Sequence, residues 1–573
     1  MKIKYRINNF KAFSDSGEMS FSPVTVLCGA NSTGKSSIIK SILLAKQSTA
    51  ERRSSLKIDA PSQPLILNGE LTKLGAWSDT ITGKDRAKSM GFCWSVKLSQ
   101  EEFDDALKRA GLLRRGEASS ELDLANQRDL TLSVSLSSDT EVREELSARV
   151  DRWDVNLDDL NVRVFRQEVA NGSRPLYRVE INSIRKLIRR KGSKFGSYRV
   201  ILGDLHKALS GADTPISLGN VYAVNSGPFI GRIEPRFDET WTNFFEAIYK
   251  LSVSHRGRKR GPAPGWLEDL GAAVRTYRKG LSEGKMPTAR NTAMRVLTYL
   301  AIEFVSEISL VFSETKAVLA PMWQDIRYLG PLRDQPRRYY QFDDTGGADV
   351  GVSGEFTVQV LALEQGRVLQ STRLASLPSN RIKFTDRKLT TLLDHTNFWL
   401  SWMGLPAVSP LNLQQSLYGL AVGDLRVGLL DVGFGVSQVL PIIVETLRAE
   451  KGDLVILEQP EIHLHPRVQA LLGDFLLARS QDGVRFLVES HSEYLIKRLC
   501  RRVSESESEN LRPSIEILFI EGSPEGASCR PVELNDYGEI LNWPKGFFDL
   551  DEDLHWTHAA LERRRASNAK KQK

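Results

Sequence analysis

The sequence predicts an α/β fold, and two patterns that lie far apart in the chain carry this prediction. The first is GANSTGKS at residues 29–36, a complete G-x-x-x-x-G-K-S loop between the apolar β-prone run 24–28 and the helix-patterned segment 36–44. The second is LVILEQPEIHLHP at residues 454–466, an apolar strand that ends in acids. Such a loop is meaningful when it follows a strand and opens a helix, as it does here. Together the patterns predict the two halves of one nucleoside triphosphate site.

The loop at 29–36 is expected to hold the phosphates. Glycines at 29 and 34 let backbone N–H groups turn inward at a helix N-terminus. Lys35 is expected to reach the β- and γ-phosphates, and the Ser36 hydroxyl is expected to ligate Mg²⁺. The predicted cofactors are therefore ATP and Mg²⁺. The expected nucleotide-binding residues here are Gly29, Ala30, Asn31, Ser32, Thr33, Gly34, Lys35, Ser36 and Ser37.

The acids after the second strand are expected to perform the catalytic chemistry. In P-loop enzymes a second apolar strand ends in an acid that holds Mg²⁺, and Glu458 occupies this place. A following Glu would normally deprotonate the attacking water. Here that residue is Gln459, which positions water without accepting its proton, and Glu461 is the nearest alternative base. A further strand leads to ESHS at 489–492, so His491 is expected to hydrogen-bond a γ-phosphate or the attacking water.

The two halves of the site are separated by a long insertion. Residues 1–99 are expected to form the N-terminal half of the ATPase domain, and residues 326–550 its C-terminal half. Residues 100–325 are predicted to be a largely helical, basic insertion domain. The reason is that EEFDDALKRAGLL at 101–113 is amphipathic and that 286–318 carry apolar residues at spacings of three and four. Residues 551–573 form a basic tail. Strands are expected in the N-terminal half at 2–7, 19–21, 24–28, 64–68 and 91–98.

The net charge of +7 is unevenly distributed. Residues 563–573 carry six positive charges and no acid, residues 185–199 carry seven and no acid, and residues 255–260 are denser still. Such blocks neutralise phosphates and release counterions, although a solvated face or a disordered tail also accounts for them. The candidates for nucleic-acid binding are Arg185, Lys186, Arg189, Arg190, Lys191, Arg256, Arg258, Lys259 and Arg260.

The composition favours a cytoplasmic protein with no membrane partner. The apolar fraction of 41% and the charged fraction of 26% are ordinary for a soluble protein. No apolar stretch approaches the roughly 18 residues that span a bilayer. The N-terminus, MKIKYRINNFKAF, lacks the apolar region of a signal peptide. The four cysteines show no C-x-x-C spacing and are expected to be reduced.

These patterns resemble the ATPase fold shared by ABC transporters, RecF and SMC proteins. Closer still are bacterial SMC/RecF-like AAA-type ATPases related to the overcoming-lysogenization-defect proteins and to ATPase subunits of anti-phage systems such as Septu. The resemblance implies an α/β, ABC/SMC-head-type P-loop ATPase split by the insertion. The segments that carry it are NFKAF at 9–13, the loop at 29–37, YLGPLR at 328–333, GFGVSQ at 433–438, EQPEIHLHP at 458–466, ESHS at 489–492 and GEILNWPKGFF at 538–548.

The resemblance also implies a head-to-tail dimer, or a higher oligomer, in which two ATP molecules are sandwiched. Each ATP would lie between the Lys35 loop of one subunit and the signature segment of the other, here Gly433, Gly435 and Ser437. The chain departs from the family twice. The sequence L-S-G-G-Q is not spelled, because Ser437 follows the glycines, and Glu-Gln at 458–459 replaces Asp-Glu. The second departure implies slow hydrolysis, with ATP acting mainly as a clamp on the dimer.

The function favoured by these features is a nucleotide-gated dimer switch that senses or binds nucleic acid. It would control a separately encoded effector, such as a nuclease or toxin, in prokaryotic anti-phage defence. The alternatives are a DNA repair or recombination ATPase of the RecF type and an ATP-binding scaffold with little turnover; a transporter subunit fits the length poorly. LFIEG at 518–522 resembles the opening of a metal-dependent nuclease domain, with Asp549 and Asp551 as further acids. Too little sequence follows for that domain, so intrinsic nuclease activity is not expected.

Overall fold

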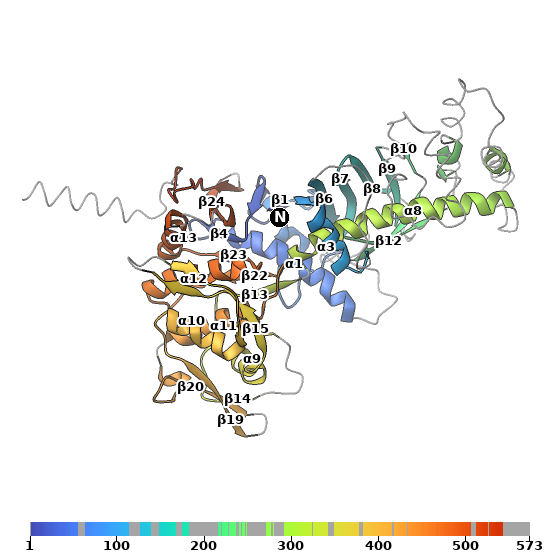
Figure 1. Ribbon diagram of the computed structural model, residues 1–573. Helices are drawn as coiled ribbons and strands as arrows, with labels where there is room; N and C mark the ends of the chain where they lie inside the picture. The colour runs from blue at the N-terminus through green and yellow to red at the C-terminus, as the bar shows by residue number, and fades with distance from the viewer. Residues whose placement is uncertain are drawn as a thin grey trace, which may run out of the picture. The chain divides into compact units, whose positions relative to one another are not determined.

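The chain folds into two compact units, each with a large β-sheet of its own (Figure 1). Unit 1 comprises Met1–Ser20 and Ser37–Gln324, and unit 2 comprises Phe21–Ser36 and Asp325–Lys573. The computed structural model describes residues 2–542 except for 55–63, 114–126, 139–147, 168–174, 183–215, 219, 227–228, 237–239, 242, 247, 249–270, 277–278, 280–291, 324, 342–348, 378–381, 415–416, 433, 506–510 and 525.

Unit 1 is built on an eleven-stranded sheet with the order β12-β11-β9-β8-β7-β6-β5-β1-β2, to which β10 and β3 add beside β9 and β1. Neighbours along this path are antiparallel. The strands are β1 (Lys2–Phe10), β2 (Phe13–Asp15), β3 (Met19–Phe21), β5 (Met90–Ser99), β6 (Gln127–Ser138), β7 (Ala148–Leu157), β8 (Leu160–Gln167), β9 (Leu176–Ile181), β10 (Ile216–Ser217), β11 (Val221–Ser226) and β12 (Phe229–Pro235). Its helices include α1 (Lys35–Ser54, which begins in unit 2), α2 (Trp77–Thr80), α3 (Gln100–Arg109) and α8 (Thr292–Leu319), with short turns η1 (Thr82–Lys84) and η2 (Ala320–Met322).

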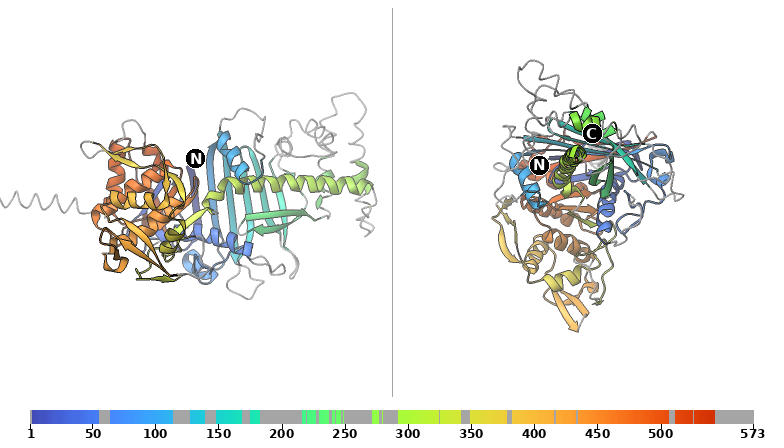
Figure 2. Two further views of the ribbon diagram at one scale, coloured as in Figure 1. Left: turned by 60° about the horizontal axis from the view of Figure 1, so that its bottom comes forward. Right: turned by 90° about the vertical axis from the view of Figure 1, so that its right-hand side faces the viewer.

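One face of this sheet is apolar and the other is polar, as is common in antiparallel sheets. In β5, Phe92, Trp94 and Val96 are buried, whereas the residues between them are more exposed. The ring of Trp94 lies 5.4 Å from that of Trp323 and 5.7 Å from that of Phe229, measured between centroids. Helix α8 crosses the strands and contacts β12, β7 and β6 (Figure 2). Large buried rings of this kind dominate the energetics of a core.

The expected largely helical insertion is wrong for the described part of residues 100–325. Helices α3 and α8 are present where the sequence predicts them, but β6 to β12 lie between them. In β6 the residues Leu130, Leu132 and Val134 are buried, and Thr131 and Ser133 between them are less so. This period of two is a strand signal. The helical patterns at 101–113 and 286–318 are local to α3 and α8 and do not extend to the segments between them.

The expected boundary between residues 99 and 100 is also absent. β5 pairs with β6 along its whole length, so the two sides of that boundary share one sheet. Of the N-terminal region only Phe21–Ser36 belongs to unit 2. The later division, between Gln324 and Asp325, lies one residue from the expected position.

The strand expected at 64–68 is not formed, although its apolar residues are buried. Leu65 and Leu67 are inaccessible to solvent or nearly so, and the described segment has only one isolated bridge, at Asn68. Gln47 of α1 takes the place of a partner strand, because its Nε2 donates to the carbonyl oxygen of Ile66 at 2.7 Å. A side chain satisfies backbone groups here that a sequence pattern assigns to a sheet.

Unit 2 contains a six-stranded sheet in the order β13-β22-β23-β4-β24-β25. The first five strands are parallel, and β25 is antiparallel to β24. The strand that precedes the loop, β4, is therefore separated from the acid strand, β22, by β23. The bounds are β4 (Val24–Cys28), β13 (Ile326–Leu329), β22 (Leu454–Glu458), β23 (Arg485–Glu489), β24 (Ile515–Ser523) and β25 (Gly526–Pro531).

The central parallel strands are continuous apolar runs because both faces of the sheet are covered. Every residue of β4 and of β22 is buried. Helix α12 (Pro466–Gln481) contacts β23 and β4 and packs along α13 (Glu493–Glu505). Asp474 of α12 is fully buried and accepts hydrogen bonds from Arg498 and Arg502 of α13. This buried ion-pair network fixes the two helices together.

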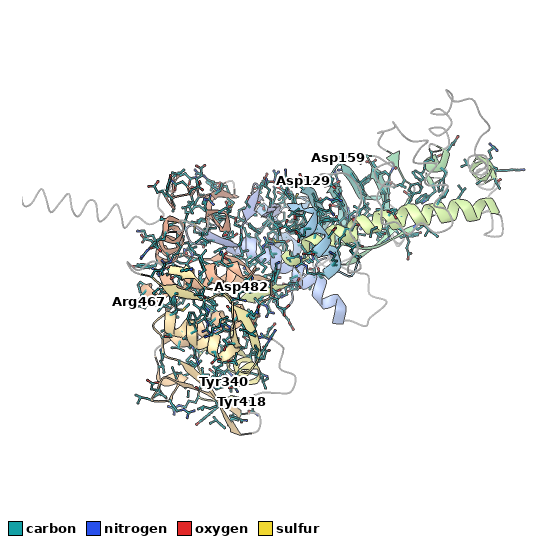
Figure 3. All side chains as sticks on the ribbon, viewed as in Figure 1. Asp129, Asp159, Tyr340, Tyr418, Arg467 and Asp482 are labelled. Atoms are coloured by element: carbon teal, nitrogen blue, oxygen red, sulfur yellow. The ribbon has the colours of Figure 1, made fainter. Side chains whose placement is uncertain are left out.

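The smaller elements of unit 2 lie mostly between β13 and β22 in the chain. Tyr340 and Tyr418 are paired residues of β14 and β20 in a four-stranded sheet (Figure 3). That sheet comprises β14 (Tyr340–Gln341), β19 (Val408–Gln414), β20 (Leu417–Val422) and β21 (Val427–Gly428). Two hairpins pair β15 (Val368–Ser371) with β18 (Lys388–Thr391) and β16 (Leu374–Ser376) with β17 (Ile382–Phe384). The helices and turns are α9 (Thr357–Glu364), α10 (Leu392–Trp402), α11 (Phe434–Arg448), η4 (Leu429–Asp431) and η5 (Arg512–Ser514).

Several predicted features lie outside the described residues. These are the nucleic-acid candidates at 185–191 and 256–260, Gly433 of the signature segment, Asp549 and Asp551, and the basic tail. Within the part of the chain that is described, no helix is both long enough and apolar enough to cross a membrane.

Candidate nucleotide-binding site

The predicted phosphate loop joins the end of β4 to the start of α1. Its backbone has positive φ angles at Gly29 (138°), Ser32 (61°) and Gly34 (111°). Gly29 also passes so close to β24 that a Cβ atom there would lie 2.3 Å from the carbonyl oxygen of Ile520. Residue 29 must therefore be glycine for two reasons, its backbone conformation and the close approach of the neighbouring strand.

The two loop side chains with predicted roles bond to the protein itself. Lys35 Nζ donates to the carbonyl oxygens of Ala30 at 2.6 Å and Gly29 at 3.1 Å. Ser36 Oγ donates to the carboxylate of Glu489, at 2.9 Å from Oε2 and 3.2 Å from Oε1. Burial lowers the pKa of Lys35, and the charge of Glu489 opposes this shift. The same atoms, Nζ and Oγ, contact phosphate and Mg²⁺ in P-loop enzymes.

The carboxyl ends of β4, β23 and β22 bring the acids to the loop. Parallel strands end at one edge of a sheet, and the register pairs Glu458 with Glu489 and Glu489 with Leu27, two residues before Gly29. The sequence-predicted Glu458 and the loop therefore share an edge, with β23 between them. Glu489 bonds the loop directly, a role that the ESHS motif alone does not predict. The available signal was its place at the end of a buried strand, in register with Glu458.

Glu458 is contacted from β13, the strand on its other side. The hydroxyl of Tyr328 donates to Glu458 Oε1 at 2.7 Å. Burial and the adjacent Glu458 carboxylate both raise the pKa of Tyr328, so this hydroxyl keeps its proton. Tyr328 begins the YLGPLR segment at 328–333. This segment contributes to the family resemblance, but its sequence predicts no chemical role. The structure places this segment beside the acids.

Arg333, at the end of the same segment, has N–H groups that are available to a ligand. Its Nη2 lies 3.5 Å from the backbone carbonyl oxygen of Glu458. Its Nε and Nη1 are buried and have no hydrogen-bond partner among the described residues. Burial lowers the pKa of Arg333 to about 10, although Tyr328 and the carboxylates of Glu458 and Glu461 oppose the shift. The group still carries its charge at neutral pH, and a guanidinium of this kind suits a phosphate oxygen.

Glu461, the predicted alternative base, is engaged on both oxygens. Oε2 accepts from the Ser490 hydroxyl at 2.9 Å, and Oε1 accepts from the backbone N–H of His491 at 2.6 Å. Burial raises the pKa of Glu461, and these hydrogen bonds oppose the shift. Glu461 therefore ties the end of β22 to the end of β23. It is less available to accept a proton from water than its place in the sequence suggests.

Gln459 and His491 complete the described edge. Gln459 has a positive φ of 44°, and its backbone N–H donates to the carbonyl oxygen of Glu489 at 2.8 Å. This hydrogen bond extends the pairing of β22 and β23 beyond the strand ends. Burial and the charge of Lys35 lower the pKa of His491, so its imidazole is neutral at pH 7.

The signature segment opens helix α11. Gly435 and Ser437 lie near its N-terminal end. The side chain of Ser437 is largely buried, whereas Gly435 is partly exposed. The predicted role of this segment is toward a second copy of the chain, and it stays a prediction.

The residues at this edge fit Mg²⁺. Hydroxyl and carboxylate oxygens are its preferred protein ligands, and Ser36, Glu489 and Glu458 supply them. No cluster of three or more His, Cys, Asp or Glu residues in the described ranges is arranged to hold a metal. Mg²⁺ in such sites uses one or two protein oxygens together with water and phosphate, so a protein-only cluster is not required.

Three segments of the chain match family models. Residues 1–128 match "AAA ATPase domain", residues 415–497 match "AAA domain, putative AbiEii toxin, Type IV TA system", and residues 513–554 match "Protein of unknown function (DUF3696)". No curated protein matches the chain. The first match includes the phosphate loop, and the second includes Glu458, Glu489 and His491. The AAA matches therefore cover both halves of the site.

Solved structures of SMC head domains are similar to the chain. An Smc head bound to the C-winged helix domain of ScpA is 9% identical with a TM-score of 0.33, over 93% of this chain and 97% of that one. An Smc head with an extended coiled coil, bound to the C-terminal domain of ScpA and derived from Pyrococcus furiosus, is 10% identical with a TM-score of 0.31, over 99% and 100%. The SMC head domain from Thermotoga maritima is 10% identical with a TM-score of 0.32, over 93% and 100%.

The loop, the strand order and the AAA matches together support a P-loop ATPase. The fold is α/β, as the sequence predicts, and the two AAA matches include the phosphate loop and the acid strand. The TM-scores of the SMC heads are too low to add to this assignment. It depends on the described sheet, in which β4 carries the loop, β22 carries the acid and β23 lies between them. The AAA matches support ATPase activity.

Proposed function

We propose that the chain binds and hydrolyses MgATP at the carboxyl edge of the unit 2 sheet, and that the nucleotide gates a dimeric switch. The single observation that carries the ATP part is the convergence at this edge. The loop at 29–36, Glu458, Glu461, Glu489 and His491 come from three separate segments and lie at the ends of three adjacent parallel strands. Convergent charged groups at a strand-end edge are the usual place for a ligand in such sheets.

The roles follow from the chemistry of each group. Lys35 and the N–H groups of the loop bind the β- and γ-phosphates, and Arg333 adds N–H donors from the other side of the acids. Mg²⁺, when bound, neutralises charge that develops on the phosphates. Gln459 and His491 position the attacking water by hydrogen bonds. Glu461 holds the ends of β22 and β23 together, and because both of its oxygens accept hydrogen bonds it takes the proton of the water slowly.

The biological role in the proposal is prokaryotic anti-phage defence. The chain would dimerise head to tail through the Gly433, Gly435 and Ser437 segment, sense nucleic acid through its basic segments and control a separate nuclease or toxin. Support comes from the resemblance to overcoming-lysogenization-defect and Septu-like ATPases. The family model matched at 415–497 also includes a toxin of a toxin–antitoxin system in its description. A RecF-type repair ATPase shares the mechanism and is the alternative role.

A second candidate function is an ATP-binding scaffold with little turnover. Two observations favour it: residue 459 is Gln, and both oxygens of Glu461 accept hydrogen bonds. In this case ATP binding alone would close the dimer, and hydrolysis would only reset it.

The experiment measures nucleotide binding, phosphate release and oligomeric state on the full chain. A fluorescent ATP analogue reports affinity, a phosphate sensor reports turnover with and without DNA or RNA, and light scattering reports the mass with and without MgATP. The proposal expects binding, an ATP-dependent dimer and turnover stimulated by nucleic acid. Binding and dimerisation without turnover would favour the scaffold. Absence of binding by a folded protein would refute the site.

A further inference from the structure

We propose that Glu489 of β23 is the carboxylate that works with Ser36 at the Mg²⁺ ion, whereas Glu458 lies one strand farther from the loop. The inference rests on the proposed ATP site and refines it. A sequence reading gives the metal to Glu458, because the acid after the second apolar strand holds Mg²⁺ in P-loop enzymes. The contacts at this edge favour a different assignment.

The first step is the hydrogen bond from the loop. Ser36 Oγ, the hydroxyl expected on the metal, donates to both oxygens of Glu489, at 2.9 Å and 3.2 Å. A carboxylate that a metal-ligating hydroxyl reaches directly lies within the coordination sphere or in contact with its water.

The second step is the strand order. β23 lies between β4 and β22, so its last residue is a direct neighbour of the loop strand. Glu489 is in register with Leu27 of β4, while Glu458 is in register with Glu489. Neighbouring strands are about 4.8 Å apart, so Glu458 starts roughly that much farther from the loop.

The third step is what each acid already contacts. Glu458 accepts from the hydroxyl of Tyr328 at 2.7 Å, on the side of the strand that faces away from the loop. Glu489 instead accepts hydrogen bonds from Ser36 of the loop on both of its oxygens. Of the two acids, Glu489 is therefore the one that already meets the hydroxyl expected on the metal.

The arrangement also explains the Glu-Gln sequence at 458–459. If Glu489 takes the metal, Glu458 is left to orient Tyr328 and the YLGPLR segment, whose Arg333 lies beside it. The motif after β23 would then contribute a metal acid and, two residues later, His491. Glu458 then does not have to supply the metal acid alone.

The test compares Glu489→Gln with Glu458→Gln in the full-length protein, with Glu521→Gln as a control on an exposed pair with Arg530. A fluorescent ATP analogue is titrated with Mg²⁺ and in EDTA, and Mn²⁺ bound with ATP is counted by electron paramagnetic resonance. We expect Glu489→Gln to weaken Mg²⁺ binding by about 10–100-fold while ATP affinity in EDTA is kept, the size usual for losing a group that supports a metal. Glu458→Gln should weaken it less than Glu489→Gln, and Glu521→Gln should not change it.

The opposite ranking, with Glu458→Gln losing Mg²⁺ and Glu489→Gln keeping it, would overturn the assignment. Glu489→Asp serves if Glu489→Gln does not fold, because it keeps the charge and shortens the reach to Ser36; unchanged Mg²⁺ affinity in that variant would also overturn it. If the wild-type protein binds no ATP in EDTA or in Mg²⁺, the proposed function is at fault. If the wild type binds ATP and the variants show the opposite ranking, the ATP site stands and only the assignment of the metal to Glu489 fails.

Discussion

The two units place their charged side chains in opposite ways. In unit 1, Arg152 pairs with Asp154 at 2.7 Å on the polar face of the sheet, and Arg163 lies 3.5 Å from the same acid. About half of each arginine side chain stays exposed. In unit 2, Lys35, Glu458 and Glu489 are almost entirely buried at the end of the sheet. Water solvates the charges on the polar face of unit 1, whereas the buried charges of unit 2 are held by hydrogen bonds within the protein.

The contrast follows from the kind of sheet. Only one face of the antiparallel sheet of unit 1 is apolar, so polar residues alternate with apolar ones along strands such as β5 and β6. The central parallel strands of unit 2 are covered on both faces, and the acids Glu458 and Glu489 stand at the last positions of β22 and β23. Ends of adjacent parallel strands meet at one edge, so charges that are scattered in the chain collect there. Burial then removes the water that would otherwise solvate them.

The largest expected effect is on ATP binding by Lys35→Ala. This removes the buried ammonium group of unit 2 that is expected to contact the β- and γ-phosphates, and we expect ATP binding to be abolished, a loss of at least about 100-fold. Titration with a fluorescent ATP analogue measures it. The matched control is Lys97→Ala in unit 1, where the ammonium forms an exposed pair with Asp129 at 3.5 Å. Wild-type affinity in Lys35→Ala would refute the site and erase the contrast between the units.

The next effect concerns the apolar face of unit 1. Trp153 of β7 is fully buried, and its ring lies 5.3 Å from that of Tyr177. Trp153→Ala should lower the free energy of unfolding by about 3–5 kcal/mol, because it removes a large ring from a packed core. Urea unfolding followed by circular dichroism measures this loss. A loss below about 1 kcal/mol would mean that this face is not a close-packed core.

The sequence predicts the core of unit 2 well and unit 1 poorly for this reason. Residues 454–458 and 24–28 are unbroken apolar runs, which a buried parallel strand requires. Residues 91–98 are correctly predicted as a strand. Leu130 to Leu136 alternate just as plainly in β6, but residues 100–325 are predicted to be largely helical from the patterns at 101–113 and 286–318. The alternation in β6 to β8 identifies the rest of the sheet. Its period of two was the missed signal.

The site shows the same division between what is local and what is not. The loop at 29–36 and Glu458 are read directly, because each is set by a short motif. The contacts of Glu489 with Ser36 and of Tyr328 with Glu458 join residues separated by 453 and 130 positions. Only the strand order makes them neighbours. A sequence pattern does not reveal that both oxygens of Glu461 are used at 2.6 and 2.9 Å.

A third prediction tests burial in unit 2 away from the site. His395 of α10 is fully buried, with Nε2 3.3 Å from the carbonyl oxygen of Leu369 and Nδ1 accepting from Arg373 Nε at 3.4 Å. Burial, helped by the charge of Arg373, lowers its pKa from 6.5 to about 4. Between pH 6.5 and about 4, His395 therefore binds a proton in the unfolded chain but not in the folded chain. Stability from this residue is complete above pH 6.5 and is lost as the pH falls toward 4.

The size of the loss follows from the shift, and His395→Gln isolates it. One pKa unit corresponds to about 1.4 kcal/mol, so the contribution reaches on the order of 3 kcal/mol near pH 4. Urea unfolding at pH 7, 6 and 5 measures the slope, and the variant should show a smaller one than the wild type. Equal slopes would mean that His395 does not titrate differently in the two states. Burial in unit 2 would then not prevent protonation, and the contrast with the exposed charges of unit 1 would be weaker.

The smallest expected effect is the loss of a charge on the open face of unit 1. Arg152→Ala removes one partner of the Asp154 pair, but Asp154 keeps Arg163 within 3.5 Å. Exposed pairs contribute about 0–1 kcal/mol, so the free energy of unfolding should change by less than about 1 kcal/mol and ATP affinity should stay the same. Urea unfolding and nucleotide titration of the same preparation measure both quantities. A change in ATP affinity would show that the polar face of unit 1 acts on the unit 2 site, and the separation of solvated from functional charges would no longer hold.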